Sequence, residues 1–287
     1  MQWQRVVELH SAERGDHGSG YLLAPTLALT AHHCIEGLQT IDLRPLQADA
    51  HGLPGDVGPW QAARIVWFSS EHDLALLAPG EKRAKFACDG GATTFGRLDS
   101  RAAAAVRVHA LGFPQAMEKP THSDTLMVAA RVNALTGIRA GSLVLDVEGT
   151  RPASGEDWKG ISGAAVFAGD RLVAVIKAVP PKLDESALLA APAHPIFDHP
   201  AAMAFLHDAG LGLDTRFIDA AYVDALPPVG HWRGLREEYT RAVIESLCSI
   251  DGLGLAVTGA PERRIPALAA FTAQRLRRWP DQTPASR

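Results

Sequence analysis

Short apolar runs of strand length, separated by turn signals, follow one another through the first 180 residues of the chain. Pro54-Gly55, Gly90-Gly91 and Gly169-Asp170 are examples of these turn signals. Such runs are typical of a β-barrel or β-sandwich. We therefore expect a mainly β fold with strands at 5–9, 20–24, 63–68, 74–77, 106–111, 125–131, 142–147, 164–167 and 172–178, and a surface loop at 48–60.

Three segments along the chain carry the groups that peptide hydrolysis needs. Residues 30–34 (Thr-Ala-His-His-Cys) offer an imidazole, Asp73 precedes the apolar run 74–77, and residues 160–164 read Gly-Ile-Ser-Gly-Ala. Acyl transfer at neutral pH needs a hydroxyl nucleophile, an imidazole base and a carboxylate that orients the base. A serine flanked by glycines can occupy a tight turn, in which the N–H groups of Gly160 and Ser162 converge as an oxyanion hole.

These segments resemble the histidine, aspartate and serine motifs of the trypsin-like (chymotrypsin-fold) serine peptidases, in that family's order. The glycine-rich run 18–23 and the hairpin 165–176 resemble the family's flanking strands. The resemblance implies two six-stranded β-barrels with His33 and Asp73 on the first, Ser162 on the second, and catalysis between them. His33 is favoured over His32 because the family's catalytic imidazole directly precedes the cysteine.

The resemblance also suggests residues that bind the substrate, and they favour different side chains before the scissile bond. Glu156, six positions before Ser162, aligns with the floor of the specificity pocket and favours a basic P1 residue. Lys177 lies on the strand that pairs with substrate, and Val179 stands where broad pockets have glycine, which favours a small apolar P1 residue. Both alternatives stay open.

Two departures from the family pattern concern activation and disulfides. Ile161 replaces the aspartate that pairs with a new N-terminus in secreted zymogens, so we expect no activation by N-terminal trimming. Cys34 matches a family half-cystine, but Gly18 occupies the partner's position. With Cys88 and Cys248 the count is three, without Cys-x-x-Cys spacing, which predicts free thiols and no metal site.

The composition gives no reason to expect nucleic acid, membrane or cofactor. The net charge is −4, no run of eighteen apolar residues exists, and no signal-peptide pattern opens the sequence. We therefore expect a cytoplasmic protein without a cofactor.

The 287 residues suffice for a peptidase domain at 1–212 and a smaller region at 213–287. In that order we expect a helix from a cap at Asp198 to Gly210, helices at 215–226 and 231–248, a strand at 252–258, a helix at 265–279 and a disordered tail. The arrangement resembles bacterial intracellular peptidases fused to modules of defence and signalling systems, which implies a regulatory protein partner bound by the C-terminal helices.

Two functions remain compatible with the sequence. One is an active serine endopeptidase that cleaves protein or peptide substrates through His33, Asp73 and Ser162. The other is a catalytically idle peptidase fold that serves as a protein-binding module. The presence of all three residues favours activity.

Overall fold

The computed structural model describes residues 1–48, 54–81, 84–86, 93–99, 104–119, 122–133, 136–137, 140–149, 152–180 and 186–225. The chain divides into two compact units, Met1–Trp232 and Arg233–Arg287, and all described residues belong to the first. The helices and strand expected beyond residue 230, together with Cys88 and Cys248, lie outside the described residues.

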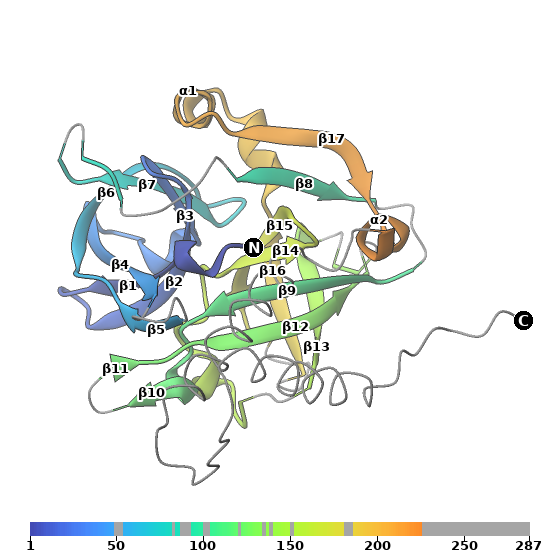
Figure 1. Cartoon of the computed structure of the whole chain (residues 1–287), viewed down its shortest axis with the longest axis horizontal. Helices are drawn as coiled ribbons and strands as arrows, with labels where there is room; N and C mark the ends of the chain where they lie inside the picture. The colour runs from blue at the N-terminus through green and yellow to red at the C-terminus, as the bar shows by residue number, and fades with distance from the viewer. Residues whose placement is uncertain are drawn as a thin grey trace, which may run out of the picture. The chain divides into compact units, whose positions relative to one another are not determined.

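Six antiparallel strands close the first barrel (Figure 1, blue to cyan). Around the ring they are β1 (Val6–Ser11), β2 (Asp16–Ala24), β3 (Leu27–Thr30), β7 (Leu74–Pro79), β6 (Gln61–Ser69) and β4 (Thr40–Ala48), which pairs back with β1. A short strand, β5 (Pro54–Val57), pairs with the end of β4. The prediction of a loop at 48–60 was therefore wrong at 54–57. These residues pair with the backbone of β4, although Pro54 and Gly55 are typical of turns.

A second ring of six antiparallel strands forms the other barrel. It runs through β14 (Ala165–Ala168), β9 (Val106–Gly112), β12 (Leu126–Val132), β13 (Leu143–Glu148), β16 (Ala187–Pro192) and β15 (Arg171–Ala178), which pairs back with β14. The hairpin β10 (Glu118–Lys119) and β11 (His122–Ser123) stands apart as its own small sheet. The two six-stranded barrels and all nine strands expected from the sequence are thus confirmed.

Two parallel strands extend the second sheet beyond its ring. β8 (Thr94–Leu98) pairs with β15, and β17 (Gly212–Ile218) pairs with β8, as Figure 1 shows. The prediction of a helix from residue 215 was wrong up to Ile218, because this stretch pairs with β8 as part of strand β17. Helix α2 (Ala220–Ala225) begins only afterwards.

Apolar side chains fill each barrel and also join the two. One buried cluster lies in the first barrel and another in the second. A third contains residues of both barrels, with the rings of Tyr21 and Phe167 in edge contact at 5.1 Å. Helix α1 (Pro200–Asp208) adds Ala202 and Leu206 to this third cluster. The barrels are therefore packed on a shared core, and a site at their junction has rigid support.

Short helical segments complete the described chain. They are the 3₁₀ helices η1 (Trp3–Arg5), η2 (His32–Cys34), η3 (Gln115–Met117), η5 (Glu156–Trp158) and η6 (His194–Asp198). The helix expected after residue 198 is confirmed as α1, but its N-cap is His199, because Asp198 still belongs to η6. Among the helices described, none is long and apolar enough to cross a membrane.

Candidate active site

His33 and Asp73 are brought together by neighbouring strands of the first barrel. β3 and β7 are antiparallel partners, with Thr30 opposite Ala75, so the segments at these strand ends meet although 40 residues separate His33 from Asp73. His33 Nδ1 lies 2.9 Å from Oδ2 of Asp73, and the backbone N–H of His33 donates to Oδ1 at 2.9 Å. The carboxylate therefore fixes both the backbone and the ring of His33.

Asp73 has an unusual backbone conformation. Its φ of +52° makes it the one described residue other than glycine with a positive φ. Such a conformation is costly for a residue with a Cβ and is often found where function demands it. Here it accompanies a side chain that is only 11% exposed and that accepts two hydrogen bonds from one histidine.

The pair shifts the pKa of both groups. The hydrogen bond to Asp73 is the main cause that raises the pKa of His33 to about 10, with a smaller contribution from Cys34. Burial alone would raise the pKa of Asp73, but its hydrogen bonds with His33 hold it below the usual value. The imidazole must therefore lose its proton before it can act as a base.

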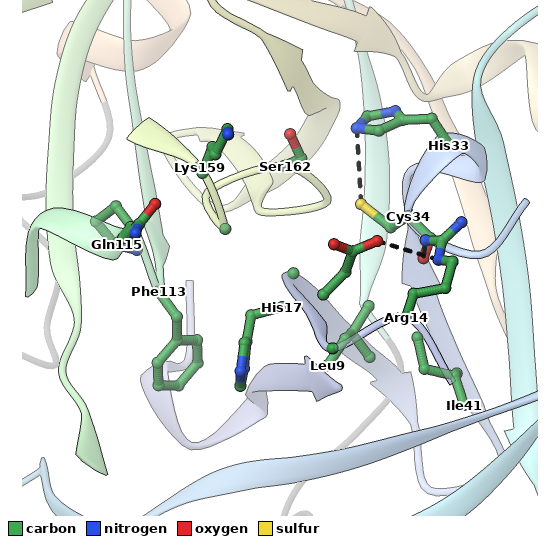
Figure 2. A pocket seen from close by; sticks show the side chains of 15 residues that line it. Leu9, Arg14, His17, His33, Cys34, Ile41, Phe113, Gln115, Lys159 and Ser162 are labelled. Carbon is green, nitrogen blue, oxygen red and sulfur yellow. Dashed lines mark hydrogen bonds and ion pairs between the residues drawn. The ribbon is translucent and has the colours of Figure 1, made fainter. Parts of the chain in front are cut away.

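Ser162 lies on the second barrel, in the turn between η5 and β14. Ser162 and His33 line the same cavity, of about 420 Å³, between residues of the two barrels (Figure 2). The Ser162 hydroxyl donates to the backbone carbonyl of Lys177 at 2.8 Å, whereas His33 Nε2 lies 3.7 Å from Sγ of Cys34. In this state the hydroxyl and the imidazole share a cavity but are bound to other groups.

The turn before Ser162 leaves two amide donors free. Lys159 has ψ 142° and Gly160 has φ +89°, which together with the hydrogen bond from Ile161 N–H to Trp158 O (3.1 Å) make a type II turn. The N–H groups of residues 161, 163 and 164 all donate to backbone carbonyls. Within the described residues, no group accepts from the N–H of Gly160 or Ser162. These two amides are available to stabilise an anion beside the Ser162 hydroxyl.

The residues expected to bind substrate are separated in the structure. The side chain of Glu156, on η5, is 75% exposed, and its carboxylate forms an ion pair with Lys159. Val179 packs against the core of the second barrel. The backbone carbonyl of Lys177 accepts a hydrogen bond from the Ser162 hydroxyl. Glu156 and Val179 are not among the residues that line the cavity.

His32 and Cys34 flank His33 and differ in their surroundings. His32 is buried and stacks on Phe68, with ring centroids 4.7 Å apart. Cys34 is a free, partly buried cysteine that lines the cavity. The sequence singled out Cys34 for its missing disulfide partner, not for its contact with His33.

The fold and the site together define a protein of the serine-peptidase type. The family model for the trypsin-like peptidase domain matches residues 18–175, and the chain belongs to that family. No curated protein matches the chain.

The chain is similar at low identity to solved structures of two proteases and of one inactivated protease paralogue. The scabies mite inactivated protease paralogue S-I1 is 16% identical, with a TM-score of 0.51 over 72% of this chain and 96% of that one. Deg5 is 16% identical, with a TM-score of 0.48 over 73% and 92% of the two chains. The active form of the Rv3671c protease from M. tuberculosis is 16% identical, with a TM-score of 0.46 over 76% and 85%.

Proposed function

We propose that the chain is a serine endopeptidase in which Ser162 attacks the peptide carbonyl and His33, oriented by Asp73, transfers the proton. The N–H groups of Gly160 and Ser162 hold the oxyanion. The observation that carries this proposal is the hydrogen bond of His33 Nδ1 to Asp73 beside the cavity that His33 shares with Ser162. It leaves Nε2 as the ring nitrogen available to the reaction.

The reaction requires the Ser162 hydroxyl to leave the carbonyl of Lys177. A backbone N–H of a substrate strand aligned on β15 can take over that carbonyl, and rotation about the Cα–Cβ bond of Ser162 then directs the hydroxyl to His33. Neutral His33 accepts the hydroxyl proton as the Oγ–carbon bond forms, and the carbonyl electron pair moves to the oxyanion. Collapse of the adduct breaks the C–N bond, and His33 returns the proton to the leaving amine. Water repeats the cycle to release the acid.

The direct test uses an activated ester or a fluorogenic peptide. Wild-type protein should hydrolyse it, and Ser162→Ala should lower kcat by about 10⁴-fold or more, because the nucleophile is lost. Ser142→Ala, which alters a buried serine elsewhere in the second barrel, is the matched control and should keep the wild-type rate. Equal rates for Ser162→Ala and wild type would contradict the proposal.

The P1 preference is a separate question. Exposure of Glu156 and its pairing with Lys159 weaken the argument for a basic P1 residue, because the charge is already compensated on the surface. Val179, the basis of the small apolar alternative, packs against the core of the second barrel and does not line the cavity. Both alternatives stay open, and a fluorogenic panel that varies only P1 decides between them.

A second candidate function is a peptidase fold that binds proteins without cleaving them. The hydrogen bond of the Ser162 hydroxyl to Lys177, in place of one to His33, is the observation that favours it. Wild-type protein that hydrolyses no ester and yet is folded would support this alternative.

We also propose that a protein partner controls the peptidase in a bacterial defence or signalling system, from within the cytoplasm. The support is the resemblance to peptidases fused to such modules. Because β17 and α2 belong to the first compact unit, a truncation that tests this idea must retain them and end after residue 232. The truncated protein should cleave a small ester at the wild-type rate but lose its response to the partner.

A further inference from the structure

Ser19 of the first barrel reaches across to the nucleophile turn of the second. It lies on β2, is fully buried, and its hydroxyl is 2.7 Å from the carbonyl oxygen of Gly160 and 2.9 Å from the backbone nitrogen of Phe113. An N–H group can only donate, so the hydroxyl accepts from Phe113, and its single hydrogen goes to the Gly160 carbonyl. The orientation of the hydroxyl is therefore fixed.

The backbone of Ser19 holds a second carbonyl in the same turn. Its N–H donates to the carbonyl of Ser162 at 2.8 Å, and its own carbonyl accepts from the Thr30 hydroxyl at 2.8 Å. One residue thus binds the carbonyl of Gly160 and the carbonyl of the nucleophile itself.

These contacts fix alternate peptide groups of the turn. In the group between residues 160 and 161, Ser19 binds the carbonyl and Trp158 accepts from the N–H. In the group between residues 162 and 163, Ser19 binds the carbonyl and Ile176 accepts from the N–H at 2.8 Å. The N–H of Ser162 belongs to the peptide group between these two, and the N–H of Gly160 belongs to the group just before them. Within the described residues neither of these donors has an acceptor.

Neighbouring glycines make this close approach possible. A Cβ at Gly163 would lie 1.9 Å from the carbonyl oxygen of Ser19, and a Cβ at Gly112 would lie 2.7 Å from its hydroxyl oxygen. The absence of a side chain at these two positions therefore leaves the space in which Ser19 contacts the turn.

We propose that Ser19 is a positioning residue for the oxyanion hole: its hydroxyl holds the turn so that the amides of Gly160 and Ser162 face the reacting carbonyl oxygen. The proposal rests on the peptidase function proposed above. Ile161, next to the nucleophile, is buried in the core of the second barrel and has no charge to pair. Ser19 supplies the restraint from the first barrel.

The test is Ser19→Ala, assayed with a p-nitrophenyl ester for kcat and KM across a pH series. Loss of one oxyanion donor slows acyl transfer by about 10²–10³-fold. In Ser19→Ala the amides of Gly160 and Ser162 are still present but misaligned, so kcat should fall by about tenfold to a hundredfold. KM and the midpoint of the pH profile should stay unchanged, because the His33–Asp73 pair is untouched. Ser142→Ala is the matched control: it removes a buried hydroxyl that donates to the carbonyl of Ala140 and should keep the wild-type kcat.

The outcomes separate this role from a general loss of stability. A folded Ser19→Ala protein with the wild-type kcat overturns the proposal, and so does an equal fall in kcat for Ser142→Ala at a similar melting temperature. If Ser19→Ala does not fold, Ser19→Cys keeps a weak donor in its place. A lower kcat with unchanged KM then supports the proposal, and the wild-type kcat overturns it. An inactive wild-type protein would instead contradict the peptidase function itself.

Discussion

The first and second barrels hold their parts of the site by different means. In the first, a charged pair does so: Asp73 binds the ring and the backbone of His33. In the second, the turn around Ser162 is held by backbone hydrogen bonds and by Ser19. The pair of His33 and Asp73 is thus assembled in this structure, whereas the Ser162 hydroxyl donates to the carbonyl of Lys177.

Variants in the two barrels should therefore lose activity in different ways. Changes to the charged pair alter the protonation of His33, and therefore the pH dependence of the reaction. Changes to the turn alter the alignment of two amides, and therefore the rate at every pH. A first-barrel variant that lowers the rate equally at every pH, or a second-barrel variant that shifts the pH profile, would contradict this distinction.

The largest effect is expected from Asp73→Asn in the first barrel. Without the carboxylate the imidazole loses its orientation and its preferred tautomer, and kcat should fall by about 10⁴-fold at neutral pH. Asp146→Asn, on an exposed face of β13, should have no effect on an ester assay. A fall of less than tenfold for Asp73→Asn would show that the carboxylate does not orient the base.

A smaller effect is expected from Gly160→Ala in the second barrel. The new Cβ would lie 2.3 Å from the carbonyl oxygen of Phe113, and the φ of +89° strains any residue other than glycine. The displaced turn should lower kcat by about 10²–10³-fold while leaving the midpoint of the pH profile in place. Gly155→Ala is the matched control, because that glycine has φ −59° and open space around it. Wild-type activity in Gly160→Ala would mean that the turn tolerates the change.

The mildest perturbation is pH alone. Because Asp73 raises the pKa of His33 to about 10, kcat/KM should keep rising from neutral into alkaline pH as His33 loses its proton. Asp73→Asn should move the midpoint of this rise to lower pH, whereas His207→Gln, at an exposed histidine, should leave it unchanged. A midpoint at or below pH 6.5 in the wild type would contradict the strong pairing.

The same pairing has a consequence for stability. Because the pKa of His33 is higher in the folded than in the unfolded chain, protonated His33 stabilises the fold. This contribution to stability is fully present at pH values below the pKa of His33 in the unfolded chain. This contribution is lost as pH rises through the folded value, so the melting temperature should fall between neutral and alkaline pH. Asp73→Asn should weaken that dependence.

The sequence was sufficient to predict both barrels and the meeting of His33 with Asp73 beside the cavity that Ser162 lines, because strand runs and the three motifs are local patterns. It placed Glu156 and Val179 at a substrate pocket, and neither lines the cavity. Strand β17 was missed because its reason to be a strand is the pairing with β8, which is more than 100 residues away. The role of Ser19 was missed for a similar reason: its partner Gly160 is 141 residues away. The hydrogen bond from the Ser162 hydroxyl to Lys177 depends on a side-chain rotamer, which no spacing of residues reveals.

The most direct measurement is the intact mass of the protein after reaction with a fluorophosphonate, followed by mapping of the adduct. A single adduct on Ser162, formed more slowly in His33→Ala and absent from Ser162→Ala, is the predicted result. A folded wild-type protein that takes up no adduct, or that carries it on another residue, would contradict the assignment of Ser162 as the nucleophile.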